Sequence, residues 1–226
     1  MTVTSPLTAA VVFDLDGVLI ESEQVWDAAR RAVAAEHGGR WRESATREML
    51  GMSSPEWSRY VHEKLAVDLA PQEIEQLVVA RVLEEYRRSL PLLPGAVQAV
   101  EALAAVWPLG LASSSNRVVI DEVLRLAGLD ERFAVTVSSE EVARGKPAPD
   151  VYLAAVDALG VRAGAAVAVE DSANGLRAAA AAGLRVIAVP NRQFPPSADA
   201  LELAELVLPS LQLLRPEAIM RAGGKL

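Results

Sequence analysis

The chain has 226 residues, of which 51% are hydrophobic, enough for one large α/β domain or for a core with a smaller inserted module. The formal net charge is −8, which argues against nucleic-acid binding because phosphate backbones require clustered Lys and Arg. The absence of cysteine excludes disulfides, thiolate nucleophiles and Cys-ligated zinc. Residues 1–10 lack a signal-peptide pattern and no apolar stretch resembles a membrane span, so a cytoplasmic protein without membrane contacts is expected.

Short runs of β-branched and apolar residues recur along the chain and predict buried parallel strands. The expected strands are Ala9–Phe13, Leu109–Ala112, Val135–Val137, Ala166–Val169, Val186–Val189 and Leu206–Leu208. Helical patterns lie between several of them, over Asn116–Leu126, Asp150–Leu159 and Ala173–Ala182, and each is followed by a glycine suited to a left-handed cap. This alternation predicts an α/β fold with a doubly wound, Rossmann-like parallel sheet.

The stretch from Leu19 to about Leu90 contains no convincing strand and interrupts that alternation. Helices are expected over Glu21–Glu36, Arg42–Leu50, Pro55–Leu65 and Pro71–Ser89. We therefore predict an all-helical cap domain at residues 19–90, inserted into an α/β catalytic core of residues 1–18 and 91–226. An insertion after the first strand would lie over the carboxyl end of the sheet, where open α/β sheets bind ligands.

Asp14 and Asp16 follow the first predicted strand, two residues apart, and strand geometry points both side chains the same way. Gly17 permits a sharp turn directly after them. Two structural alternatives are an ordinary surface turn and a calcium loop. The calcium loop is disfavoured because the string follows a buried strand and lacks the later Glu at the required offset.

Three further segments indicate that Asp14 and Asp16 belong to a phosphoryl-transfer site. Ser113, Ser114 and Asn116 lie where a strand gives way to a helix, a place suited to phosphate, although a simple helix cap is the alternative. Lys146 lies in a loop stiffened by two prolines, although most isolated lysines are solvated surface groups. Glu170 and Asp171 end another strand, where one acid is often only a helix cap but two suggest a hard cation.

Together these segments resemble the haloacid dehalogenase superfamily of phosphohydrolases, in the branch of β-phosphoglucomutase and the sugar-phosphate phosphatases. The resemblance covers roughly residues 11–189, in order and at family-like spacing. It rests on four strings, Phe13-Asp14-Leu15-Asp16-Gly17-Val18-Leu19, Ala112-Ser113-Ser114-Ser115, Gly145-Lys146-Pro147-Ala148-Pro149-Asp150 and Val169-Glu170-Asp171-Ser172-Ala173-Asn174-Gly175.

The resemblance implies a role for each of these residues. Asp14 would be the nucleophile that forms an aspartyl-phosphate, and Asp16 would protonate the leaving oxygen and then activate water. Ser113 and Lys146 would hold the transferring phosphoryl group, with Ser114 and Asn116 adding contacts to phosphate. Mg²⁺ would be bound by Asp14, Asp16 through its carbonyl, Glu170 and Asp171.

The charges of these groups agree with that assignment. The four carboxylates outweigh Mg²⁺ and Lys146 by one negative charge if all of them are ionised, which would repel a phosphate dianion. Protonation of Asp16 brings the site to neutrality, and the protonated form is the one a general acid requires. Mg²⁺ suits an all-oxygen, partly hydrated site beside phosphate, so the site is expected to need this cation.

The expected activity is hydrolysis of a small phosphorylated metabolite, such as a sugar phosphate, with a β-phosphoglucomutase-type phosphomutase as the alternative. Mutases of this branch carry a His where this chain has Trp26 and a basic residue after the cap glycine, where this chain reads Met52-Ser53-Ser54. Both departures favour a phosphatase. A catalytically inactive phospho-ligand sensor and a dehalogenase explain fewer of the acidic residues. A monomer is expected, with a dimer as the alternative.

Overall fold

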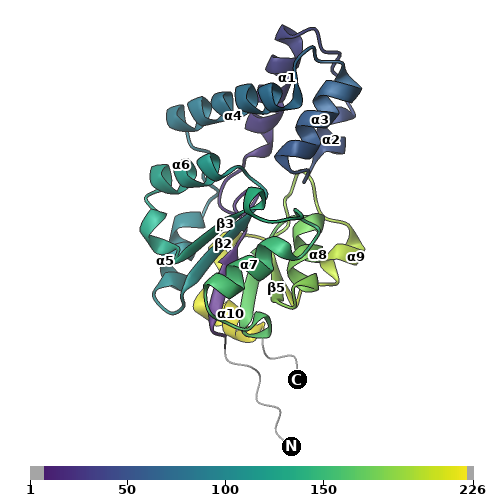
Figure 1. The fold of residues 1–226 in the computed structure, drawn as a ribbon. Helices are drawn as coiled ribbons and strands as arrows, with labels where there is room; N and C mark the ends of the chain where they lie inside the picture. The colour runs from purple at the N-terminus through teal and green to yellow at the C-terminus, as the bar shows by residue number, and fades with distance from the viewer. Residues whose placement is uncertain (1–7, 223–226) are drawn as a thin grey trace, which may run out of the picture.

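The computed structural model describes residues 8–222, and its centre is one sheet of six parallel strands in the order β3-β2-β1-β4-β5-β6 (Figure 1). The strands are β1 (Ala10–Phe13), β2 (Leu109–Ser113), β3 (Val135–Ser138), β4 (Ala166–Glu170), β5 (Arg185–Ala188) and β6 (Leu206–Val207). β1 lies between β2 and β4, with Val11 paired to Leu109 on one side and to Val167 on the other. The residues that follow β1, β2 and β4 therefore meet at one edge of the sheet.

Helices cover both faces of the sheet, which confirms the predicted doubly wound fold. On one face, α5 (Ala96–Ala104), α6 (Arg117–Ala127) and α10 (Pro216–Arg221) pack in a core that includes Val11 and Phe13. On the other face, α7 (Asp150–Ala158) and α8 (Ala173–Ala181) pack with Val12, and the short α9 (Ala198–Leu201) lies beside α8. Successive β1 side chains thus enter opposite cores, as strand geometry requires.

The predicted strands and helices all appear, with ends shifted by a few residues. Gly128, Gly160 and Gly183 have φ values of 67°, 68° and 81°, so each helix ends in the left-handed conformation as predicted. The helices α5, α9 and α10 were not predicted, and the alanine-rich sequence of α5 gives a weak pattern beside the Pro94-Gly95 breaker. Asp150 is the first residue of α7, and its carboxylate pairs with Arg144 at 2.8 Å.

Four helices lie together beyond the carboxyl ends of the strands (Figure 1). They are α1 (Glu23–Glu36), α2 (Ala45–Met49), α3 (Ser54–Leu65) and α4 (Pro71–Arg88). Two chain segments connect them to the sheet region and run side by side, since Glu21 N donates to the Pro91 carbonyl at 2.8 Å and Leu93 N to the Leu19 carbonyl at 2.9 Å. These four helices occupy the stretch where helices and no strand were expected, although the segment Arg42–Leu50 forms only the short α2.

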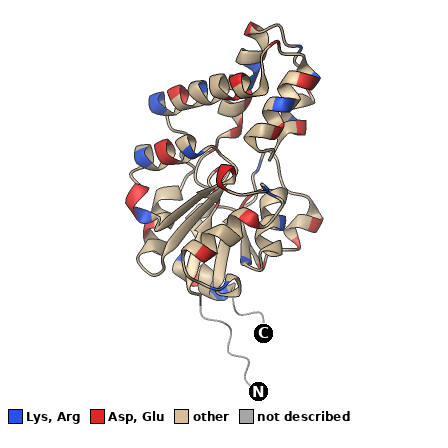
Figure 2. Cartoon of the chain, in the orientation of Figure 1, with Lys and Arg blue, Asp and Glu red and all other residues tan. Residues whose placement is uncertain are grey.

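Charged residues of both signs alternate along the outer helices, for example on α4 and α6 (Figure 2). An ion pair between Arg87 of α4 and Glu122 of α6, at 2.5 Å, joins the helical layer to the sheet region. Among residues 8–222, no helix is both long and apolar enough to cross a bilayer. The expected lack of a targeting segment concerns mainly residues 1–7, which lie outside the described part of the chain.

Replacing Phe13 with Ala should lower the free energy of unfolding by about 3–5 kcal/mol, because the ring is fully buried directly before the candidate site. Its ring also meets Phe133 edge-on, with centroids 6.0 Å apart. Urea unfolding measures this loss, and Val118→Ala on exposed α6 is the control, expected to change stability by less than about 0.5 kcal/mol. A Phe13→Ala loss below about 1 kcal/mol would contradict this role in the core.

Candidate active site

The turn after β1 brings Asp14 and Asp16 to the carboxyl edge of the sheet. Asp14 is buried, and its backbone N–H donates to the Val169 carbonyl at 3.0 Å, which extends the pairing of β1 with β4. Gly17 has a φ of 79°, and a Cβ atom there would lie 2.0 Å from Asp171 Oδ2. Glycine is therefore required by both the turn and the close approach of Asp171.

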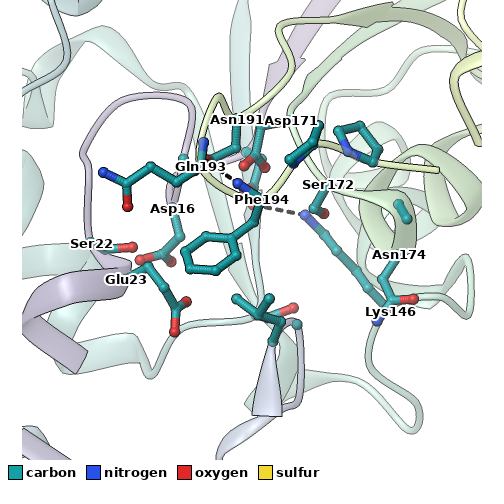
Figure 3. A pocket seen from close by; sticks show the side chains of 18 of the residues that line it. Asp16, Ser22, Glu23, Lys146, Asp171, Ser172, Asn174, Asn191, Gln193 and Phe194 are labelled. Carbon is teal, nitrogen blue, oxygen red and sulfur yellow. Dashed lines mark hydrogen bonds and ion pairs between the residues drawn. The ribbon is translucent and has the colours of Figure 1, made fainter. Parts of the chain in front are cut away.

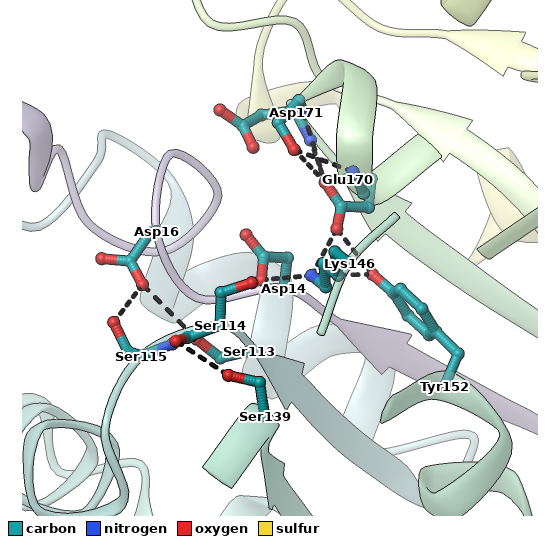
Figure 4. Close-up of polar contacts among 12 residues, drawn as sticks. Asp14, Asp16, Ser113, Ser114, Ser115, Ser139, Lys146, Tyr152, Glu170 and Asp171 are labelled. Carbon is teal, nitrogen blue, oxygen red and sulfur yellow. Dashed lines mark hydrogen bonds and ion pairs between the residues drawn. The ribbon is translucent and has the colours of Figure 1, made fainter. Parts of the chain in front are cut away.

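Lys146 is the central cation of the site (Figure 4). Its ammonium donates to Asp14 Oδ1 at 2.7 Å and to Glu170 Oε1 at 2.5 Å, and all three side chains are buried. The Tyr152 ring lies 4.9 Å from the ammonium, and its hydroxyl donates to Glu170 Oε1 at 2.8 Å. Burial opposes the charge on Lys146, but Asp14 and Glu170 raise the pKa of the amine above its ordinary value. The lysine is thus held as a cation.

Glu170 uses both carboxylate oxygens within the protein. While Oε1 accepts from Lys146 and Tyr152, Oε2 accepts from the backbone N–H of Asp171 at 3.0 Å and from Ser172 at 3.3 Å. The first turn of α8 closes over this carboxylate, since a Cβ at Gly175 would lie 1.8 Å from Oε1. These contacts fix Glu170 as the group that positions Lys146.

Serines at the end of β2 hold Asp16 (Figure 4). Ser115 Oγ donates to Asp16 Oδ2 at 2.6 Å, and Ser113 Oγ lies 3.4 Å from the same oxygen. Ser113 is fully buried and also accepts from the Ser115 N–H at 3.0 Å. Asp16 Oδ1 is buried without a hydrogen-bond partner among residues 8–222, so one oxygen of this carboxyl remains open to a ligand.

Asn116, a predicted phosphate contact, lies away from the cavity. Its side-chain carbonyl accepts from Ser54 at 2.7 Å, and its amide donates to Glu75 and Glu140, both at 2.7 Å. Ser54 and Glu75 belong to the helical layer and Glu140 to the sheet region, so the amide joins the two. This geometry gives a phosphate contact of Asn116 no support.

Three buried carboxylates form a cluster at the same edge. Asp14, Glu170 and Asp171 each offer an oxygen within 4.8 Å of the others. Burial raises the pKa of Asp14 to about 8 despite the adjacent Lys146, and burial with the Glu170 and Asp14 charges raises the pKa of Asp171 well above its usual range. Asp171 Oδ1 is buried and has no partner in the described chain. A hard divalent cation fits this set, because it would permit all the oxygens to be ionised together.

A cavity of about 510 Å³ opens above these groups (Figure 3). Asp14, Asp16, Lys146 and Asp171 form part of its wall, and Ser114 is the predicted phosphate-binding serine that reaches it. The helical layer contributes Ser22, Glu23, Arg47, Leu50 and Gly51. The loop after β5 contributes Asn191 and residues 193–197, with the Phe194 ring projecting into the space (Figure 3).

The structure thus brings together seven of the eight predicted site residues, with Asn116 apart. Tyr152 and Ser115 were missed, although Ser115 lies within a string that had been recognised. The only sequence signal for Tyr152 is its position six residues after Lys146, on the helix that follows the loop. Residues 191–197 gave no signal, since their role depends on where the loop lies relative to the helical layer.

Comparisons with known proteins agree with this geometry. The sequence model of the haloacid dehalogenase-like hydrolases matches residues 8–183. The chain belongs to this family. It is 35% identical to hexitol phosphatase B of Escherichia coli K12, over 80% of this chain and 83% of that protein. It is 33% identical to the phosphorylated carbohydrates phosphatase of Thermotoga maritima, over 79% and 83% of the two chains.

The fold is similar to that of a solved relative. The crystal structure of CbbY from Rhodobacter sphaeroides in complex with phosphate superposes with a TM-score of 0.81 and 30% identity, and the match covers 92% of this chain and 96% of that one. The predicted membership of the superfamily and the predicted α/β architecture are both confirmed.

Mg²⁺ should stabilise the protein more at pH 8 than at pH 5. Because the folded-state pKa of Asp14 lies above its ordinary value of 3.8, bound protons stabilise the fold at low pH, and this contribution is lost as the pH rises through about 8. A cation competes with those protons, so its stabilising effect should grow over the same range. Thermal unfolding midpoints with and without millimolar Mg²⁺ measure the difference.

Asp171→Asn tests whether this cluster holds the cation, since it removes one negative charge and retains the shape of the side chain. Most of the Mg²⁺-dependent rise should disappear in this variant. An equal rise at both pH values, or an undiminished rise in Asp171→Asn, would show that the cation binds elsewhere.

Proposed function

We propose that this chain is a Mg²⁺-dependent phosphatase that hydrolyses a small phosphorylated metabolite, a sugar phosphate, through an aspartyl-phosphate on Asp14. The observation that carries the proposal is the pair of contacts from buried Lys146 to Asp14 and Glu170, at the wall of a cavity that Asp16 and Asp171 also line. A nucleophile, a proton donor and a cation for phosphate thus face one space.

Asp14 is suited to act as the nucleophile. Lys146 holds its Oδ1, so Oδ2 is the oxygen assigned to attack phosphorus while the bond to the leaving oxygen breaks. A protonated Asp16 gives its proton to that oxygen, and the ionised Asp16 then takes a proton from the water that attacks the acyl phosphate. The second step restores both carboxyl groups. Ser115 keeps Asp16 oriented in both steps through its contact to Oδ2.

The phosphoryl oxygens need positive charge and hydrogen-bond donors. Lys146 lines the cavity and supplies a positive charge and N–H donors. Ser114, which lies between β2 and α6, also lines the cavity and could donate from its hydroxyl and its backbone N–H. Ser113, the other predicted phosphate ligand, is fully buried and contacts Asp16, so its hydroxyl would have to turn to reach a phosphoryl group.

Mg²⁺ would be held by the Asp14 and Asp171 carboxylates and the Asp16 carbonyl, with Glu170 contributing its charge to the cluster. When bound, this cation neutralises charge on the carboxylates and on the phosphoryl oxygens. The free Asp171 Oδ1 and the raised pKa of Asp14 support such a ligand set.

The helical layer would act as a cap domain of residues 19–90 over a core of residues 1–18 and 91–226. It contacts the core loop that lines the cavity, where Gln24 Nε2 donates to Gln193 Oε1 at 3.4 Å. A cap that closes there would keep bulk water from the acyl phosphate.

Hydrolysis is favoured over phosphomutase chemistry by the side chain at position 26. A mutase must deprotonate a sugar hydroxyl, whereas Trp26 offers only an indole, buried against Trp57 with ring centroids 6.0 Å apart. The names of the two phosphatase relatives support the same choice.

Asp14→Asn should lower kcat for phosphate release from a hexitol phosphate by at least roughly 10³-fold, because the amide is a poor nucleophile. The measurement is released phosphate in the presence of Mg²⁺. Asp157→Asn, which changes an exposed aspartate on α7, is the control and should keep normal activity. Normal turnover by Asp14→Asn would exclude the proposed nucleophile, and no phosphate release from any ester by the unmodified protein would favour a non-catalytic sensor.

Incubation with β-glucose 1-phosphate and a bisphosphate primer separates the phosphatase from a mutase. Since Trp26 cannot act as a base, the expected products are glucose and free phosphate. Quantitative formation of glucose 6-phosphate with little free phosphate would require the mutase assignment instead.

A further inference from the structure

A side cavity of about 90 Å³ extends from the main cavity into the helical layer. The two share Asp16, Ser22, Glu23, Gly51 and Ser114 in their walls, so the side cavity begins beside the catalytic groups. The residues that line it also include Trp26, Arg30 and Trp57, from α1 and α3. Figure 3 shows Ser22 and Glu23 facing Asp16 on this side of the site.

Arg30 is an unusual residue for such a position, because it is only 5% exposed yet incompletely paired. Its guanidinium carbon lies 5.4 Å from the Trp26 ring centre and 5.1 Å from that of Trp57. Its Nε and Nη1 atoms have no hydrogen-bond partner among residues 8–222. The aromatic faces compensate part of the charge but do not satisfy these donors.

Glu23 presents the complementary acceptor. Its Oε1 lies 3.6 Å from Arg30 Nη1, beyond hydrogen-bond distance, and is likewise buried without a partner in the described chain. Leaving charged groups unsatisfied in a buried site is unfavourable, so a ligand that completes their hydrogen bonds would be bound strongly. Both groups line the same side cavity.

The charges of this pair define the ligand. Arg30 and Glu23 cancel, so a neutral group with both donors and acceptors fits, whereas a phosphate dianion would meet the Glu23 carboxylate and have only one arginine to offset its own charge. Hydroxyl groups have the required donor and acceptor character. At about 90 Å³, against about 510 Å³ for the main cavity, the side cavity suits a few small polar groups. The Trp26 and Trp57 rings suit the carbon atoms between the hydroxyls.

We propose that Arg30 and Glu23, between Trp26 and Trp57, recognise neighbouring hydroxyl groups of a monophosphorylated polyol or sugar and exclude a second phosphate. The proposal rests on the proposed phosphatase activity and names the substrate class for that site. Arg30 and Glu23 act here as specificity residues, while the residues at the edge of the sheet perform the chemistry.

The test compares two esters of equal carbon number, sorbitol 6-phosphate and n-hexyl phosphate, in Mg²⁺-dependent phosphate release. The unmodified protein should prefer the hydroxylated ester in kcat/KM. Arg30→Met should lower kcat/KM for sorbitol 6-phosphate by roughly 10- to 100-fold and change that for hexyl phosphate by less than about threefold, as expected for lost hydrogen bonds to a charged group. Arg31→Gln is the matched control. Arg31 lies next to Arg30 on α1 and also stacks on a tryptophan, Trp41, but it lines neither cavity.

Glu23→Gln keeps the volume of the side chain, so it provides a second variant if Arg30→Met does not fold. It should also weaken the preference for sorbitol 6-phosphate. The unmodified protein should hydrolyse fructose 1,6-bisphosphate at least about tenfold less efficiently than fructose 6-phosphate, and Glu23→Gln should narrow that gap because one repulsive charge is removed.

Three results would overturn the assignment while leaving the phosphatase intact. They are an unchanged ester preference in both variants, equal losses on the two esters, and a preference for the bisphosphate. Failure of the unmodified protein to release phosphate from any of these esters would instead remove the proposed activity, and the substrate assignment with it.

Discussion

The ammonium of Lys146, held between Asp14 and Glu170, is the interaction on which the rest of the site depends. It joins the ends of two adjacent strands, β1 and β4, to the loop before α7, and it does so where all three side chains are buried. Removing one partner from such a cluster would leave an uncompensated buried charge. The order of the strands, the cover of α8 over Glu170 and the ring of Tyr152 can all be understood as support for this contact.

A second consequence of that arrangement is an excess of negative charge. Lys146 alone cannot neutralise Asp14, Glu170 and Asp171, and the raised pKa values of the two aspartates follow from burial and mutual repulsion. The site therefore has room for further positive charge, which a divalent cation would supply. In the proposed function, the sheet region would supply the chemistry, and Glu23 and Arg30 of the helical layer would select among esters.

The sequence predicted the residues at the strand ends but not those whose role depends on packing between distant segments. Asp14, Lys146, Glu170 and Asp171 were recognised because each lies at the end of a strand or in a stiff loop, where local sequence dictates position. Parallel strands then bring those ends to one edge, which is a consequence of topology alone. Helix ends were predicted for the same reason, from single glycines with positive φ.

Residues whose role depends on packing between distant segments could not be predicted. Tyr152 and Arg30 lie within ordinary amphipathic helices, and nothing in the local pattern separates them from core and surface residues. The predicted phosphate contact of Asn116 lacks support for a related reason, because Ser54, Glu75 and Glu140 arrive from elsewhere to occupy its amide. The small α5 escaped because alanine carries little hydrophobic pattern.

The most direct test of the account is the covalent state of Asp14 when the second step is blocked. Asp16→Asn with acetyl phosphate, whose leaving group needs no proton from Asp16, should still transfer a phosphoryl group but should hydrolyse it slowly. Intact-mass analysis and peptide mapping after a rapid quench should find one phosphoryl group on the peptide that carries Asp14. Two results would contradict the account. One is an Asp16→Asn protein that releases phosphate steadily but carries no phosphoryl group, and the other is a phosphoryl group on a residue other than Asp14.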